Sequence, residues 1–139
     1  MNTLLLQLVN RPVYFRIASY IWLGLTCYLL FKPDLGFDRH VLFPGEDKAA
    51  HLILFGNLTF LWALNFRFAL LLHRKMVSWL VLTLGVFFAL GSEVIQEFLP
   101  KRSMDLKDVL YDLIGISLGY FLFFFVEKRI NTSREKLIN

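Results

Sequence analysis

Four long apolar runs separated by short polar segments dominate the pattern of hydrophobic and polar positions along the chain. The runs cover residues 13–31, 49–66, 76–99 and about 109–126. At a rise of about 1.5 Å per residue, roughly 18 helical residues reach about 27 Å, which is close to the roughly 30 Å hydrocarbon core of a bilayer. The pattern therefore predicts an all-α, polytopic membrane protein with four transmembrane helices.

The polar links between the runs indicate how these helices are arranged. Residues 67–75 join the second run to the third, and residues 100–108 join the third to the fourth. Helices joined by links this short pack beside each other and run antiparallel. We therefore expect a single transmembrane domain over residues 1–139, built as an antiparallel four-helix bundle, with residues 131–139 as a flexible tail.

Composition supports a membrane protein and excludes some kinds of site. Hydrophobic residues make up 57% of the chain, more than in ordinary soluble domains. Cys27 is the single cysteine, so neither an intramolecular disulfide nor a multi-cysteine metal site is possible. The residues after Tyr28 offer no small-x-small cleavage site, and we expect the first run to be a retained helix, not a signal peptide.

The distribution of charge predicts the orientation in the membrane. If both termini are cytoplasmic, the inner segments hold nine Lys and Arg residues and the outer segments hold six. The acids sharpen the contrast, because two lie inside and nine outside. Since positive charge is retained on the cytoplasmic side, the sequence predicts an N-in/C-in topology. The basic inner face then suits anionic lipid, and we expect no nucleic-acid partner.

Polar side chains gather at the ends of three runs, all on the predicted outer side. Asp47 and His51 are spaced i, i+4 and share a helix face. Asp105, Asp108 and Asp112 form one stripe at the start of the fourth run. Ionisable groups at membrane depth are costly and are typical of functional sites. The predicted ligand-binding site comprises Asp47, His51, Glu93, Gln96, Arg102, Asp105, Asp108 and Asp112.

A simpler interpretation exists for some of these residues. Asp105 and Asp108 could cap a helix and complement the positive end of its dipole. Glu93 is in the C-terminal half of its helix and Asp112 lies a full turn inside the apolar run, so capping does not explain them. They need a partner such as Arg102, Lys101 or a protonated His51, or must themselves stay protonated. We therefore expect one shared, outward-facing pocket.

The chemistry of this pocket stays open at the level of sequence. There is no H-E-x-x-H spacing, and no nucleophile or phosphate-binding glycine loop stands out, so we assign no catalytic residue and expect no metal and no cofactor. Arg102 is suited to an anionic or sugar-phosphate headgroup. Gly115 and Gly119 form a G-x-x-x-G pair, which predicts close helix packing inside the bundle, with homodimerisation as the alternative.

In this order, the motifs resemble the VanZ-like family of small bacterial membrane proteins. The resemblance spans residues 45–120 and rests on Asp47-Lys48-x-x-His51, Glu93-x-x-Gln96, Arg102-x-x-Asp105-x-x-Asp108, Gly115 and Gly119. One position departs from the family, which commonly has Asn where this chain has Asp112. The resemblance implies a multi-pass protein of the bacterial inner membrane, connected with the cell envelope or the response to glycopeptide antibiotics. It implies no particular reaction.

Three functions are compatible with these features. The favoured one is a non-enzymatic protein whose pocket binds membrane lipid, a lipid headgroup or an envelope precursor, with Arg102 on the anion and the carboxylates holding Arg102 or accepting hydroxyls. The second is an intramembrane hydrolase or transferase for a lipid-linked substrate, with Glu93 or His51 as general base. The third is a structural subunit of a larger complex, homo- or hetero-oligomeric through its membrane helices.

Overall fold

The computed structural model describes residues 11–32, 45–100 and 102–138. Within these ranges every regular element is helical: α2 (Val13–Phe31), α3 (Glu46–Leu64), the π-helix η1 (Asn65–Ala69), α4 (Arg74–Glu97) and α5 (Leu106–Ile138). Four segments are long and apolar enough to cross a membrane, with η1 continuing the span begun by α3. The prediction of an all-α fold with four membrane-spanning helices is confirmed.

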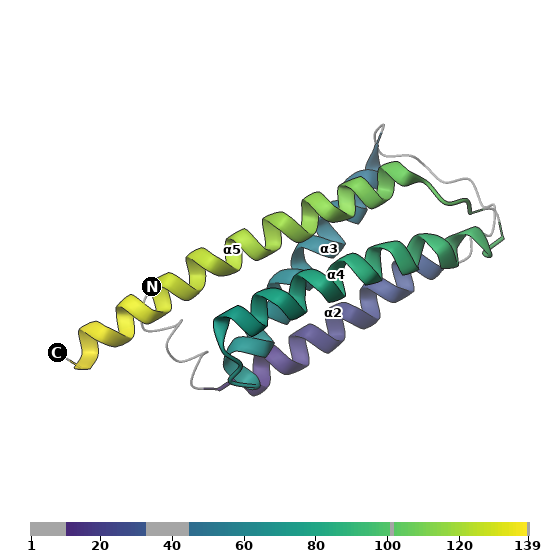
Figure 1. The fold of residues 1–139 in the computed structure, drawn as a ribbon. Helices are drawn as coiled ribbons and strands as arrows, with labels where there is room; N and C mark the ends of the chain where they lie inside the picture. The colour runs from purple at the N-terminus through teal and green to yellow at the C-terminus, as the bar shows by residue number, and fades with distance from the viewer. Residues whose placement is uncertain (1–10, 33–44, 101, 139) are drawn as a thin grey trace.

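The four long helices form an antiparallel bundle in which α3 is central (Figure 1). α3 packs against each of the other three, and its contact with α5 is the most extensive in the molecule. α2 lies on the opposite side of the bundle from α5 (Figure 1). Polar groups at the start of α3 and the start of α5 are thereby brought to one end of the bundle, next to the end of α4.

Glycine accounts for the close approach of α3 and α5. Gly115 and Gly119 of α5 lie directly against the α3 backbone at Leu52 and Gly56, where a Cβ would overlap a carbonyl oxygen. Small residues at this spacing allow two helix backbones to meet in a membrane. The G-x-x-x-G pair thus packs within the chain, and it sets the separation of the two helices that carry most of the polar residues.

The boundaries of α2 agree with the sequence prediction, whereas those of α3 differ. The predicted span was 49–66, but α3 begins at Glu46, after Gly45 in the left-handed conformation (φ 86°). Acidic residues in the first turn, Glu46 and Asp47, are favoured by the helix dipole, so the helix begins before the apolar run does. At the other end the helix widens into η1 and stops at Ala69.

α4 and α5 also depart from the predicted limits. α4 covers Arg74–Glu97 where 76–99 was predicted, and α5 covers Leu106–Ile138 where 109–126 was predicted. Residues 131–138, expected as a flexible tail, are therefore helical, and α5 continues beyond the other helices (Figure 1). The apolar run marks the part of a helix that lipid can cover, but polar residues can continue the same helix into water.

A buried acid forms ion pairs at the end of the bundle opposite the predicted site. Glu127 of α5 is 1% exposed and accepts a hydrogen bond from Arg67 Nε of η1. Arg74 Nε of α4 lies 3.5 Å from the other carboxylate oxygen. These three residues connect three helical segments, and beneath them lies an apolar core that includes Phe68 and Phe123. The sequence analysis did not identify this ion-pair network.

Candidate functional site

Four of the predicted site residues meet in a buried cluster around the imidazole of His51. His51 is 2% exposed, Glu93 and Asp112 are 0% exposed, and Asp108 is 4% exposed. They come from the second turn of α3, the last turns of α4 and the first turns of α5. Burial of so many ionisable groups is costly unless they have partners, so the contacts of each carboxylate define what the cluster can do.

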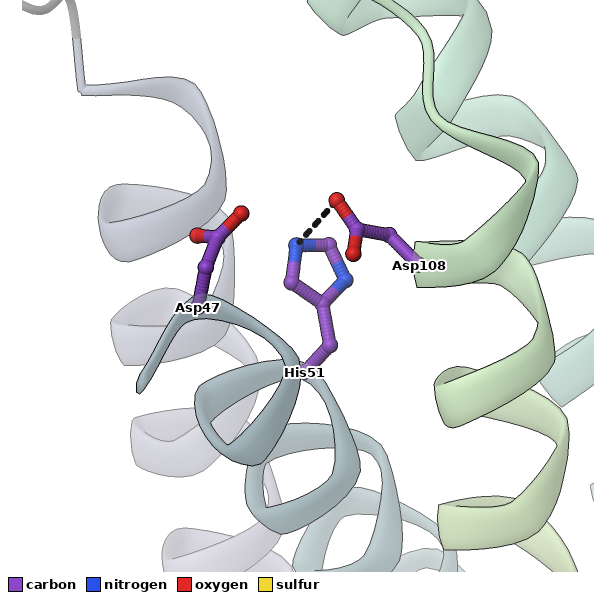
Figure 2. Close-up of side chains that lie close together, drawn as sticks. All are labelled: Asp47, His51 and Asp108. Atoms are coloured by element: carbon purple, nitrogen blue, oxygen red, sulfur yellow. Dashed lines mark ion pairs between the residues drawn. The ribbon is translucent and has the colours of Figure 1, made fainter. Parts of the chain in front are cut away.

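The two ring nitrogens of His51 face different carboxylates. Nδ1 lies within hydrogen-bonding distance of Asp112 Oδ1, at 2.9 Å, and it is the donor when the Asp112 carboxylate is ionised, because an ionised carboxylate can only accept. Glu93 Oε1 is farther from Nδ1, at 4.0 Å. On the other side of the ring, Nε2 lies 4.0 Å from Asp108 Oδ2, and the carboxylate of Asp47 faces the same nitrogen (Figure 2).

Lys48, and not Arg102, is the cation paired with Asp108 of α5 and with Asp105, which immediately precedes that helix. Its Nζ lies 3.5 Å from Asp108 Oδ1 and 3.6 Å from Asp105 Oδ2. Among the described residues no ion pair involves Arg102, so the expectation that carboxylates hold this arginine or accept hydroxyls stays a prediction. Lys48 precedes His51 by three residues in the motif and was not predicted as a site residue.

Asp105 acts mainly as the cap of α5. Its Oδ1 accepts the Lys107 N–H at 2.9 Å, the contact expected of an N-cap residue. That hydrogen bond, followed by the charge of Lys48, holds the pKa of Asp105 below its ordinary value. The backbone N–H of Asp105 in turn donates to Glu93 Oε2 at 3.0 Å. Glu93 therefore ties the start of α5 to the end of α4.

Gln96 lies apart from the His51 cluster. Its Nε2 donates to the carbonyl of Leu30 on α2 at 3.4 Å, so it links α4 to α2. Nearby, Glu97 Oε2 accepts the Met104 N–H at 2.8 Å and fixes the connection between α4 and α5. The structure thus gathers Asp47, His51, Glu93, Asp108 and Asp112, leaves Asp105 at the rim, and directs Gln96 elsewhere.

A cavity of about 320 Å³ opens beside this cluster. Its polar end is formed by Asp47, His51 and Arg102, and its wall by apolar side chains of α2 and α3: Trp22, Leu25, Leu29, Leu30, Ala50, Ile53 and Leu54. Trp22 is fixed in that wall, because its Nε1 donates to the Leu54 carbonyl at 3.0 Å. The sequence did not predict the contribution of α2, since its apolar residues carry no signal that separates a cavity wall from a lipid-facing surface.

Several buried polar atoms in this region have no hydrogen-bond partner among the described residues. They are Glu93 Oε1, Asp108 Oδ1, Asp112 Oδ2 and Arg102 Nε. Buried polar atoms are nearly always satisfied in a folded protein, so such atoms point to a ligand, an ion or water. The arginine can take an anion, whereas the carboxylate oxygens can take a cation or a hydrogen-bond donor.

Comparison with known proteins gives the family. The VanZ/LLP1 family matches residues 5–127, and the chain belongs to it. The chain is also 33% identical over 119 residues to an uncharacterized protein of Schizosaccharomyces pombe, a similarity that covers 84% of this chain and 70% of the yeast protein. No solved structure matches. Family and helices together identify a multi-pass membrane protein.

Proposed function

We propose that this member of the VanZ/LLP1 family binds a membrane amphiphile with an anionic headgroup, such as a phospholipid or a lipid-linked envelope component. The observation that carries the proposal is the composition of the cavity beside His51. One side is apolar and is made by α2 and α3, and the other presents Arg102. Ligand pockets typically combine an apolar lining with a few polar groups that fix orientation.

Arg102 is the residue best placed to contact the headgroup. It lines the cavity, and its buried Nε has no hydrogen-bond partner among the described residues. A guanidinium forms paired hydrogen bonds with phosphate or carboxylate oxygens, so an anionic group at this end would satisfy it. His51 and Asp47, which share that end of the cavity, would contact hydroxyls or a bound cation.

The dimensions of the cavity fit a headgroup and the beginning of an acyl chain. At about 320 Å³ it is near the lower end of the range for ligand pockets. Leu25 and Leu29 border it and are 40% and 43% exposed on the outside of the bundle. The remainder of a chain could therefore leave between these leucines and stay in the bilayer.

The charge distribution supports placing this cavity toward the non-cytoplasmic side. We propose the bacterial inner membrane as the location, with a lipid headgroup or envelope precursor as the ligand and a role in the response of the envelope to glycopeptide antibiotics. The similarity to a yeast protein favours a headgroup chemistry found in both kinds of membrane. A phosphate group satisfies that requirement and also suits Arg102.

Native mass spectrometry with defined lipids tests the proposal. Protein stripped of lipid would be mixed with phosphatidylglycerol or with phosphatidylcholine, and we expect preferential retention of the anionic lipid. Arg102→Gln should abolish the preference, whereas Lys107→Gln, which removes an exposed cation in the first turn of α5, should keep it. Leu25→Trp should fill the cavity and reduce retention, with Leu118→Trp on the exposed face of α5 as its control. Equal retention of both lipids by the unmodified protein would reject the proposal.

A second function is favoured by one specific contact. The Asp112 carboxylate orients His51 as a carboxylate orients a general base, at 2.9 Å, which supports a hydrolase or transferase acting on a lipid-linked substrate. Glu93 is a poorer candidate for the base, because one of its oxygens already accepts the Asp105 N–H. Incubation with phospholipid vesicles should then release a product of lipid cleavage, and His51→Gln should abolish that release. Intact vesicle lipid after prolonged incubation would count against this reaction.

A further inference from the structure

We infer that the polar end of the cavity is a binding site for a divalent transition-metal ion of the Zn²⁺ type, held by Asp47, His51 Nε2 and Asp108. This inference goes beyond the proposed binding of an amphiphile and does not depend on it. These three residues each offer one ligand atom, and the three atoms lie within 4.8 Å of one another. They come from the first two turns of α3 and the start of α5.

In the neutral tautomer whose Nδ1 donates to Asp112 Oδ1, at 2.9 Å, Nε2 of His51 is the free ligand atom and presents a lone pair. This lone pair faces the carboxylate of Asp108, whose Oδ2 is 4.0 Å away, and the carboxylate of Asp47 (Figure 2). In that tautomer Nε2 and the two carboxylates are three acceptors that repel one another. A cation bound between them would be coordinated by all three.

One buried carboxylate oxygen at this site has no hydrogen-bond partner among the described residues: Oδ1 of Asp108, a residue that is 4% exposed. The unpartnered oxygens of Glu93 and Asp112 belong to residues on the Nδ1 side of the ring and lie outside the proposed ligand set. Lys48 lies 3.5 Å from Asp108 Oδ1, which leaves Oδ2 directed at His51. Lys48 is the one lysine or arginine paired with these acids among the described residues, and it is shared between Asp105 and Asp108. When Asp47 and Asp108 are both ionised, a divalent cation would supply the positive charge that is missing between them.

Asp112 completes the site without being a ligand. Histidines that bind metals almost always donate their other ring N–H to a carboxylate or carbonyl, which fixes the tautomer and the plane of the ring. His51 and Asp112 have this relationship across the interface of α3 and α5. A second set of possible ligands, His51 Nδ1 with Glu93 and Asp112, is fully buried. We place the ion on the Nε2 side because His51 and Asp47 line the cavity there, which gives an ion a path of entry.

The donor atoms and their separation select the class of ion. A site with an imidazole nitrogen and two carboxylates suits Zn²⁺, whereas Mg²⁺ and Ca²⁺ prefer oxygen ligands alone. Tetrahedral zinc with bonds near 2.0–2.1 Å has ligand atoms about 3.3 Å apart. The Nε2 to Oδ2 separation of 4.0 Å would therefore have to shorten by less than about 1 Å on binding. Three protein ligands leave a fourth position open to the cavity, where a phosphate oxygen could bind.

Titration of the metal-stripped, detergent-solubilised protein with ZnCl2 tests this inference. We expect one Zn²⁺ per chain, a preference over MgCl2, and visible absorption bands of tetrahedral Co²⁺ when CoCl2 is used instead. Asp47→Asn should weaken Zn²⁺ binding by at least about 10-fold. Asp112→Asn keeps the acceptor for Nδ1 but removes the charge that raises the basicity of His51, and it should weaken binding by about 10- to 100-fold. Asp47 is half-buried in the first turn of α3, so its variant should keep the fold, which size-exclusion chromatography and circular dichroism would verify.

Two carboxylates serve as matched controls. Glu97→Gln removes an acid at the end of α4 whose contact is with the Met104 N–H, and it should leave Zn²⁺ affinity unchanged. Glu93→Gln should also retain binding within about threefold, because Glu93 is on the Nδ1 side of the ring. The inference is overturned if the unmodified protein binds no stoichiometric Zn²⁺, or if Glu93→Gln loses the ion while Asp47→Asn keeps it. The Arg102→Gln variant should no longer retain anionic lipid but should still bind Zn²⁺. The proposed function and this inference can therefore fail independently of each other.

Discussion

A hydrogen bond of 2.9 Å joins His51 Nδ1 and Asp112 Oδ1 across the interface of α3 and α5. Both side chains are buried, and they are contributed by the two helices with the most extensive contact in the bundle. The contact therefore has a structural and a chemical consequence. It satisfies a buried ring nitrogen, and it fixes which nitrogen of His51 faces Asp108 and the cavity.

Substitution of Asp112 tests the structural consequence of this hydrogen bond. Asp112→Asn keeps an oxygen that can accept from Nδ1, so we expect the free energy of unfolding to fall by no more than about 1 kcal/mol. Asp112→Leu leaves the ring N–H buried without an acceptor and should cost about 1–3 kcal/mol. Thermal unfolding in detergent, followed by circular dichroism, measures both. Equal stability of the two variants would contradict a structural role for the hydrogen bond.

Glycine substitutions should show how closely α3 and α5 pack. A Cβ at position 119 would overlap the carbonyl of Gly56, so Gly119→Ala has to separate the helices and should cost about 1–3 kcal/mol or more. Gly91 of α4 has open space around its Cα, and Gly91→Ala should be neutral or slightly stabilising. Unfolding in detergent would compare the pair. A neutral effect at both positions would show that the interface is looser than described.

Removing the carboxylate of Glu127 should weaken the end of the bundle opposite the His51 cluster. Glu127→Gln leaves Arg67 and Arg74 without an anion, and we expect a loss of about 1–3 kcal/mol in unfolding free energy. The value lies below the about 3–5 kcal/mol typical of fully buried pairs, because both arginines are partly exposed to solvent. Glu135→Gln, at an exposed position near the end of α5, is the matched control and should have no effect.

The capping role of Asp105 predicts a dependence of stability on pH. Its pKa is lowered in the folded protein, first by the Lys107 N–H and then by Lys48, so the ionised form stabilises the fold at pH values above the ordinary aspartate pKa of 3.8. That contribution is lost as the pH falls through the lowered folded pKa. Asp105→Asn keeps a side-chain cap but cannot titrate, so its melting temperature should decline less steeply in acid than that of the unmodified protein. Parallel declines would contradict this role.

The predicted topology can be tested at two exposed positions on opposite ends of the bundle. Ser103 lies between α4 and α5, and Leu71 lies between η1 and α4. In a Cys27→Ala background, a membrane-impermeant maleimide added to intact bacterial cells should label Ser103→Cys and should not label Leu71→Cys. Cell lysis should make both reactive. The reverse pattern would place the His51 cluster on the cytoplasmic side and would reject an outward-facing site.

The sequence by itself determined the class of the protein and the ends at which its polar residues gather. Hydropathy depends on each segment and the bilayer alone, so four spans were visible without knowledge of any contact, and α2 was bounded correctly. The i, i+4 spacing of Asp47 and His51 likewise follows from helix geometry. Hydropathy does not detect polar residues that continue a helix beyond the lipid, and for this reason α5 was predicted to end too early.

Only the tertiary structure decided which polar groups meet. Contact between helices depends on their rotation and separation, which Gly56, Gly115 and Gly119 set for α3 and α5. That packing places Asp112 in contact with Nδ1 of His51 and Lys48 in contact with Asp108, and it places Arg102 in the lining of the cavity. The wall supplied by α2 was equally hidden, because an apolar side chain has the same pattern in sequence whether it faces lipid or a cavity.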